Sequence, residues 1–183
     1  MYGCPCCNNK TFPVEPREDM GFICPVCWWE NDSFISSDDE PSDQNHGLTL
    51  NQARAYYNKC GLSDPNLAIR WAEGDTRPWS QLILLLCEKA EAFEIHCWSD
   101  EREEIALALR YGALKDTGWS GGKVIAGRVT GEFKAMLSSL PKPAPSDCGE
   151  VYDKKTPFFS IFFDNGFSVE HYGTEINCSL LRD

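Results

Sequence analysis

Residues 4–7 read Cys-Pro-Cys-Cys and residues 24–27 read Cys-Pro-Val-Cys, and these two short stretches decide how the N-terminal part of the chain folds. Two Cys-x-x-Cys pairs at this separation have the spacing of a tetrathiolate metal site. Zinc binds four cysteine sulfurs tetrahedrally, which leaves no open position for a substrate. The spacing therefore predicts one structural zinc ion, with the ligands Cys4, Cys7, Cys24 and Cys27.

Three other interpretations of the paired cysteines stay open at this point. A rubredoxin-like iron site uses similar ligands. Redox chemistry uses a single Cys-x-x-Cys motif beside a βαβ unit, and disulfides form in secreted proteins. No signal-peptide pattern follows Met1, which argues against disulfides. Cys6 is expected to be no ligand, because the adjacent Cys7 completes the first pair and neighbouring residues point apart.

The composition predicts a globular protein of a reducing compartment. The chain is 42% hydrophobic, and none of its apolar runs approaches the roughly 18 residues that span a bilayer. Most cysteines outside the two pairs sit in periodic apolar segments, where a thiol behaves as a small hydrophobe, so we expect a cytoplasmic protein. With 17 basic and 28 acidic residues, the net charge of −11 argues against nucleic-acid binding.

The chain is expected to contain two domains of the α+β class. Residues 1–65 would form a small zinc-ribbon or rubredoxin-like knuckle domain, and residues 66–79 a short helix and a linker. Residues 80–183 would form an α+β domain with a mainly antiparallel sheet. In the first domain, Thr49 and Gln52 have the spacing of a helix capping box, and Gly61 is a helix stop.

The first 65 residues carry a resemblance. The cysteine pairs, the stretch Gly-Phe-Ile-Cys-Pro-Val-Cys-Trp-Trp-Glu-Asn-Asp (21–32) and the stretch 45–61 around the capped helix together resemble the cysteine-rich CPCC family of small bacterial domains. The resemblance implies a metal-binding module with its ligands at the four cysteines named above. Such domains are often encoded near polymorphic toxins, where some are thought to act as immunity proteins or as parts of them. The long C-terminal extension is not described by the family motif.

The second domain is expected to end in a β-meander. Its predicted elements, in chain order, are a helix capped by Ser80 and reaching about Glu91, a strand over 92–98, a helix capped by Ser99 and ending at Gly112, a strand over 123–130, a helix carrying Phe133, Met136, Leu137 and Leu140, a hairpin of 158–163 and 167–172 with a type I′ turn at Asn165-Gly166, and a strand over 175–181.

No catalytic residues are expected. His96 and Cys97 are neighbours on a predicted strand, so their side chains would point to opposite faces. Gly121-Gly122-Lys123 lacks the spacing of a phosphate-binding loop and is interpreted as a turn. His171 is expected in a strand, facing the core or solvent.

The leading hypothesis is a cytoplasmic immunity protein that binds and occludes a bacterial toxin, which would be a basic protein such as a nuclease. Two acidic runs are candidate partner-binding residues: Asp38, Asp39, Glu40, Asp100, Glu101, Glu103 and Glu104. The alternatives are a zinc ribbon that binds nucleic acid or transcription proteins, and an enzyme whose residues do not form a recognisable motif.

Overall fold

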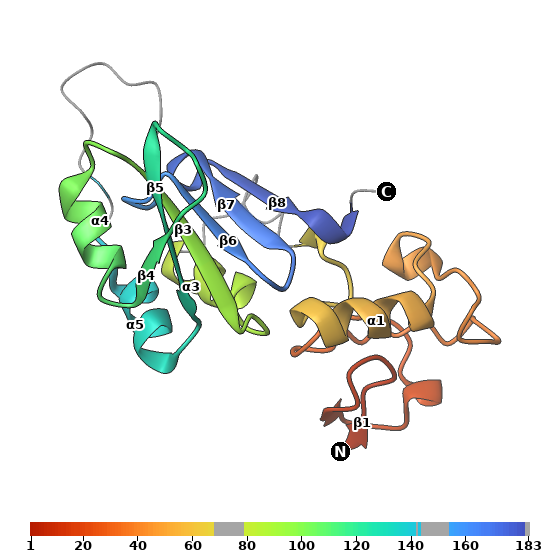
Figure 1. Cartoon of the computed structure of the whole chain (residues 1–183). Helices are drawn as coiled ribbons and strands as arrows, with labels where there is room; N and C mark the ends of the chain where they lie inside the picture. Colours follow the sequence, from red (N-terminus) through yellow and green to blue (C-terminus); the bar gives the residue numbers. More distant parts are fainter. Residues whose placement is uncertain (68–78, 142, 144–153, 182–183) are drawn as a thin grey trace. The chain divides into compact units, whose positions relative to one another are not determined.

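The structure is a computed structural model that describes residues 1–67, 79–141, 143 and 154–181 (Figure 1). The chain divides into two compact units, Met1–Leu67 and Ala68–Asp183. Most of the segment 66–79, which is predicted to form a short helix and a linker, lies outside the described residues. In the part that is described, no helix combines the length and the apolar character that crossing a membrane requires.

The first unit is built from short elements around the cysteines. Strands β1 (Tyr2–Gly3) and β2 (Lys10–Phe12) pair antiparallel on either side of the first cysteine turn. The short 3-10 helices η1 (Pro16–Glu18) and η2 (Asp43–Asn45) follow in the chain. One longer helix, α1 (Leu50–Cys60), closes the unit.

Helix α1 begins and ends where the sequence predicts. The Thr49 side chain accepts a hydrogen bond from the Gln52 N–H, and the Gln52 side chain accepts one from the Thr49 N–H. This reciprocal pair satisfies two N–H groups that the helix itself leaves unpaired. Gly61 ends the helix at φ 86°, in the left-handed region that glycine enters without steric cost. The predicted capping box is confirmed.

A buried polar network fixes the loop between the second cysteine pair and α1. The Ser42 hydroxyl donates to Asp32 Oδ2 at 2.8 Å, and Asn45 Nδ2 donates to Ser42 Oγ at 2.8 Å and to the Glu30 carbonyl at 2.8 Å. Asp32 Oδ1 accepts from the Phe34 N–H. Because each buried polar group here has a partner, the loop keeps one conformation without an apolar core of its own.

The second unit is one antiparallel sheet of six strands in the order β4-β5-β3-β6-β7-β8. The strands are β3 (Ala92–Trp98), β4 (Gly112–Lys115), β5 (Gly122–Arg128), β6 (Ser160–Phe163), β7 (Phe167–Glu170) and β8 (Glu175–Cys178). The central strand β3 is paired with β5 on one side and β6 on the other. The antiparallel α+β fold expected from the sequence is confirmed.

Three helices pack on one face of this sheet: α3 (Trp79–Leu86), α4 (Arg102–Ala108) and α5 (Gly131–Ser139). Strand β3 shows which face they cover, because Phe93, Ile95 and Cys97 are buried while the alternate residues are not. The Phe93 ring stacks on Phe133 of α5 with the ring centroids 3.8 Å apart. The apolar core of the unit therefore lies between the sheet and these helices.

The structure corrects two helix boundaries. Ser80 lies inside α3 rather than at its cap, and α3 ends at Leu86. Ser99 does not cap α4, because its hydroxyl donates to the Gly121 carbonyl and the helix begins three residues later, at Arg102. The helix ends at Ala108, and Gly112 is the first residue of β4, an edge strand that the sequence did not predict.

Two features at the end of the chain also differ from expectation. The β6–β7 hairpin turns through three residues, with only Gly166 at positive φ (98°), so the predicted two-residue type I′ turn is wrong. Asn165 instead uses its side chain to donate to the Leu86 carbonyl and to accept from the Phe167 N–H. His171 lies in a 3-10 turn, η3 (His171–Gly173), and not in a strand.

Gly127 of β5 tests the packing of the sheet. A Cβ atom added there would lie 2.6 Å from both the Tyr111 carbonyl oxygen and Phe93 Cζ. We expect Gly127→Ala to lower the free energy of unfolding by about 1–3 kcal/mol, because the backbone of residue 111 would have to shift. Gly131→Ala is the matched control, since nothing lies within 4 Å of the added carbon and alanine favours the first turn of α5. Urea unfolding curves that rank the two variants the other way would contradict this packing.

Candidate metal centre

The two cysteine turns have the same backbone geometry. The Cys4 carbonyl accepts a hydrogen bond from the Asn8 N–H at 2.9 Å, and the Cys24 carbonyl accepts one from the Trp28 N–H at 2.9 Å. Asn8 and Trp28 follow the second cysteine of each pair and both have positive φ, 59° and 69°. Each chain segment therefore makes the same tight turn, which aims both sulfurs of a pair to one side.

The four sulfurs predicted as ligands converge. The sulfur atoms of Cys4, Cys7, Cys24 and Cys27 all lie within 4.8 Å of one another. Two of the distances between the pairs are 3.6 Å (Cys4 to Cys27) and 3.7 Å (Cys7 to Cys24). Zinc–sulfur bonds of about 2.3 Å in a tetrahedron place neighbouring sulfurs about 3.8 Å apart. The spacing of the sulfurs therefore fits one tetrahedrally bound ion of this size.

The site is shielded from water. Cys4, Cys24 and Cys27 are buried and Cys7 is half-buried. Phe12, Trp29, Leu50 and Ala53 pack around the sulfurs in one apolar cluster. Such an environment weakens the competition of water for the ion and makes unpaired thiolates costly.

The thiols of Cys4, Cys24 and Cys27 shift one another's pKa because they are hydrogen-bonded to each other. Hydrogen bonds from Cys27 and Cys4, and a further one from the Thr11 hydroxyl at 3.3 Å, hold the pKa of Cys24 far below its usual range. The hydrogen bond with Cys24 raises the pKa of Cys4 to about 12, and the same partner is the first cause of the raised pKa of Cys27. A divalent cation binds the deprotonated sulfurs, so metal binding at this site would release protons.

Helix α1 holds the first cysteine turn in place. Arg54 Nε donates to the Pro5 carbonyl at 3.1 Å, and Asn9 Nδ2 donates to the Tyr57 hydroxyl at 3.1 Å. The second turn is tied to the end of the unit, where the Ser63 N–H donates to the Cys27 carbonyl at 2.8 Å. The site therefore depends on residues well beyond the two motifs.

The comparisons with known proteins agree with this site. Residues 2–77 match the family Cysteine-rich CPCC. The C-terminal part of the chain matches no family. No curated protein and no solved structure matches the chain. The CPCC segment and the first structural unit thus overlap over nearly their whole length.

Cys6 of the CPCC motif lies beside the site. It is buried in the same apolar cluster, and its contact with the Cys27 thiol, which donates to it, contributes to the raised pKa of Cys27. Cys6 is not one of the four cysteines whose sulfurs converge. Its expected role as a neighbour rather than a ligand stays a prediction.

The first acidic run is held by contacts inside the first unit, Met1–Leu67, which we call the CPCC unit. Asp38 forms an ion pair with Arg54, and Asp39 accepts a hydrogen bond from Asn51 at 2.8 Å. Glu40 accepts from the Ser36 N–H at 2.7 Å and from its hydroxyl at 2.6 Å, and these bonds lower the pKa of Glu40. These carboxylates fix a loop of the first unit, and their contact with a partner stays a prediction.

The second acidic run lies at the start of α4, in the other unit. Asp100 and Glu103 are exposed, and Glu104 is half-buried. Glu101 accepts hydrogen bonds from the Trp98 N–H and the Tyr172 hydroxyl, both at 2.7 Å. Burial raises the pKa of Glu101. Glu101 therefore has an internal role, and its exposed neighbours remain candidates for contact with a partner.

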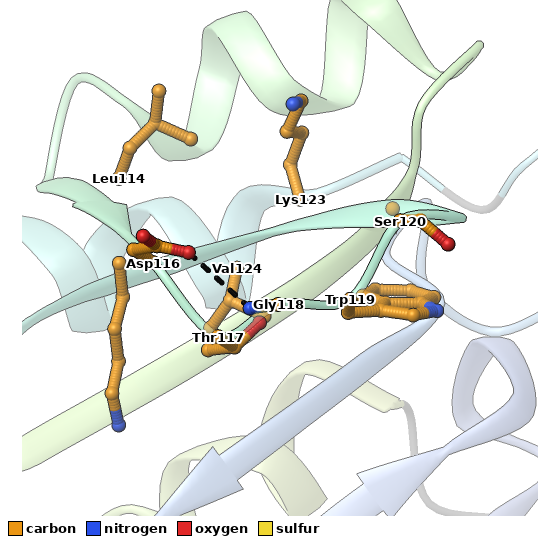
Figure 2. A pocket seen from close by; sticks show the side chains of 10 residues that line it. Leu114, Asp116, Thr117, Gly118, Trp119, Ser120, Lys123 and Val124 are labelled. Atoms are coloured by element: carbon orange, nitrogen blue, oxygen red, sulfur yellow. Dashed lines mark hydrogen bonds between the residues drawn. The ribbon is translucent and has the colours of Figure 1, made fainter.

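A pocket of about 460 Å³ lies at the β4–β5 loop of the second unit (Figure 2). Asp116, Thr117, Trp119 and Ser120 line it from the loop, and Lys123 and Val124 line it from β5. The Asp116 carboxylate accepts a hydrogen bond from the Gly118 N–H. Sequence reasoning missed this pocket, because it interpreted residues 121–123 as a turn and assigned no role to residues 116–120.

The metal site can be tested by exchanging one ligand and one neighbour. Cys24→Ser removes one of the four converging sulfurs, and we expect the purified chain to bind no metal and to lose the fold of its first unit. Cys6→Ser should keep one metal ion per chain, because Cys6 is not among the four converging ligands. Metal content by native mass spectrometry reports both variants, and loss of metal from Cys6→Ser with retention in Cys24→Ser would contradict the ligand set.

Cys97 can be tested as a nucleophile by its reactivity. Burial raises the pKa of Cys97 to about 12, and its side chain lies on the helix-covered face of β3, opposite His96. A protonated, buried thiol reacts slowly, so iodoacetamide at neutral pH should leave Cys97 unmodified in the folded chain and modify it after unfolding. Peptide mass spectrometry gives the readout. Rapid native labelling at Cys97 would indicate an activated thiol instead.

Proposed function

We propose that the chain is a cytoplasmic immunity protein that carries one structural zinc ion and acts by binding and occluding a bacterial toxin. The observation that carries the metal part is the convergence of four sulfurs at zinc-like spacing. Four thiolate ligands close the coordination sphere, so the ion would stabilise the fold rather than activate a substrate.

Two features of the described residues support a binding protein rather than an enzyme: the state of the Cys97 thiol and the set of potential metal ligands. The Cys97 thiol is buried and protonated, and the neighbouring His96 faces the other side of the sheet. In the parts of the chain that the structure describes, the four-cysteine set is the only group of potential ligands close enough to hold a metal ion. These features favour a binding protein over an enzyme that uses a cysteine nucleophile or a second, open metal site.

The charge of the chain suggests the kind of toxin. A net charge of −11 attracts a basic protein and accelerates the encounter. Nucleases are basic where they bind phosphates, so an acidic inhibitor suits them. A zinc ribbon that itself binds nucleic acid is less well supported, because Arg54, one of the few cationic side chains of the CPCC unit, is engaged by Asp38 and the Pro5 carbonyl.

Co-expression tests the immunity role directly. The chain should protect bacterial cells from the protein encoded by the adjacent reading frame and should co-purify with it in a one-to-one complex. Cys24→Ser should abolish protection if the zinc-bound fold is needed, and Cys6→Ser should retain it. A toxic neighbouring protein that is neither bound nor neutralised by the wild-type chain would refute the proposal.

A further inference from the structure

A continuous strip of aromatic rings crosses the second unit. Neighbouring rings along the strip have centroids between 4.8 and 5.7 Å apart. In order of contact, the rings belong to Phe162, His96, Trp119, Trp98 and Phe159, and the last of these touches both His171 and Tyr172. We call these seven residues the aromatic strip.

The aromatic strip is not part of the apolar core. His96 and Trp98 alternate along β3 with Phe93, Ile95 and Cys97, which face the helices. None of the seven side chains is buried, and Trp98 is 38% exposed. The core rings Phe93, Phe133, Phe158 and Phe167 are by contrast fully buried. A row of half-exposed aromatic rings is the composition found at the centre of protein–protein interfaces.

One end of the aromatic strip rests on a strained turn. His171, Tyr172 and Gly173 have φ values of 48°, 59° and 88°, so two residues with side chains follow each other in the left-handed region. Such backbone persists only where surrounding contacts hold it, and it concentrates at functional surfaces. Here the Tyr172 N–H donates to the Phe159 carbonyl, and the Tyr172 hydroxyl donates to Glu101. These two hydrogen bonds hold the strained turn in place and keep the Tyr172 ring beside Phe159.

The aromatic strip already accommodates a cation. Lys154 Nζ lies 3.8 Å from the centroid of the Tyr172 ring. A positive charge over the face of an aromatic ring is attracted by the electrons of the ring, and indole rings attract it most strongly. Trp98 and Trp119 lie edge to face in the middle of the strip, so their rings provide further positions of the same kind.

The charges around the aromatic strip also favour a basic occupant. Glu94 on β3 and Glu170 on β7 point to the face that the helices leave uncovered, and Glu170 lies directly opposite Glu175 of β8. Like charges at directly opposite positions destabilise a sheet. Glu170 accepts hydrogen bonds from Ser168 and Asn177, and His171 Nδ1 lies 3.1 Å from Glu175 Oε1, so these contacts offset part of the repulsion and a bound cation would offset more of it. Lys115 forms an ion pair with Glu94 and so offsets the charge of that third carboxylate.

We propose that the aromatic strip is the docking surface for a basic protein, which places arginine side chains over Trp98 and Trp119. This inference rests on the proposed function as a toxin-binding protein and assigns the binding surface to the second unit. Guanidinium groups stack on the faces of indole rings, which suits the two tryptophans in the middle of the aromatic strip.

A peptide of alternating arginine and glycine tests the surface without requiring the toxin. Added to the zinc-loaded full chain at low salt, it should shift the indole N–H resonances of Trp98 and Trp119 in a saturable way and leave those of Trp28 and Trp29 unchanged. Trp98→Ser should weaken the binding by about tenfold, as expected for removal of a central interface ring. Phe34→Ser is the matched control, because Phe34 is a 76% exposed ring of the other unit.

The remaining outcomes separate this inference from the proposed function. The resonance shifts are measured on the unaltered chain, so they decide the case even if Trp98→Ser unfolds. Absent shifts, equal weakening by Phe34→Ser, or tighter binding of a single-stranded oligonucleotide than of the peptide would overturn the surface. Neutralisation of the toxin that survives Trp98→Ser would overturn the surface and leave the immunity role intact. Peptide binding by a chain that binds no toxin would overturn the immunity role and leave the proposed surface intact.

Discussion

The approach of four sulfur atoms to within 4.8 Å of one another is the constraint on which the first unit depends. The core around them is small, and half of its eight fully enclosed members are cysteines. A unit of this size buries too little apolar surface to be stable on that account alone. Zinc binding contributes roughly 10–16 kcal/mol in comparable peptides, which exceeds what the few aromatic contacts can supply. The metal would therefore determine whether the unit folds, and the apolar residues would determine how.

The same constraint explains an unusual residue. Trp28 adopts φ 69°, a conformation that costs a residue with a large side chain of order 1–3 kcal/mol and that Asn8 accepts more easily at the equivalent position of the first turn. The turn cannot relax, because the Trp28 N–H must reach the Cys24 carbonyl for both sulfurs to face the ion. The Ser63 bond to the Cys27 carbonyl holds the turn from the other side. Strain here is a consequence of ligand geometry.

Sequence reasoning succeeded where structure is encoded locally. Each cysteine turn spans a few residues, and the capping box of α1 needs only Thr49 and Gln52, so the pattern alone identified both. It failed where a residue acts across the chain. Ser99 has the chemistry of a helix cap but donates to Gly121, and Asn165 looks like a turn residue but donates to the Leu86 carbonyl 79 positions away. The aromatic strip joins segments from residue 96 to residue 172, and its existence depends on the strand order, which local patterns do not specify.

The two units differ in how fully their side chains are satisfied by contacts within the unit. In the CPCC unit, the sulfurs, the acidic loop and the polar network around Ser42 all find partners within the unit. In the sheet unit, the residues on the helix-covered face are equally well packed, but the rings on the other face keep part of their surface in water. A row of exposed apolar rings lowers the stability of a folded chain, and so does backbone held in the left-handed region. Packing within the unit explains neither feature. A molecule that covered the rings would offset this cost, which is the physical reason for proposing the second unit as the binding surface.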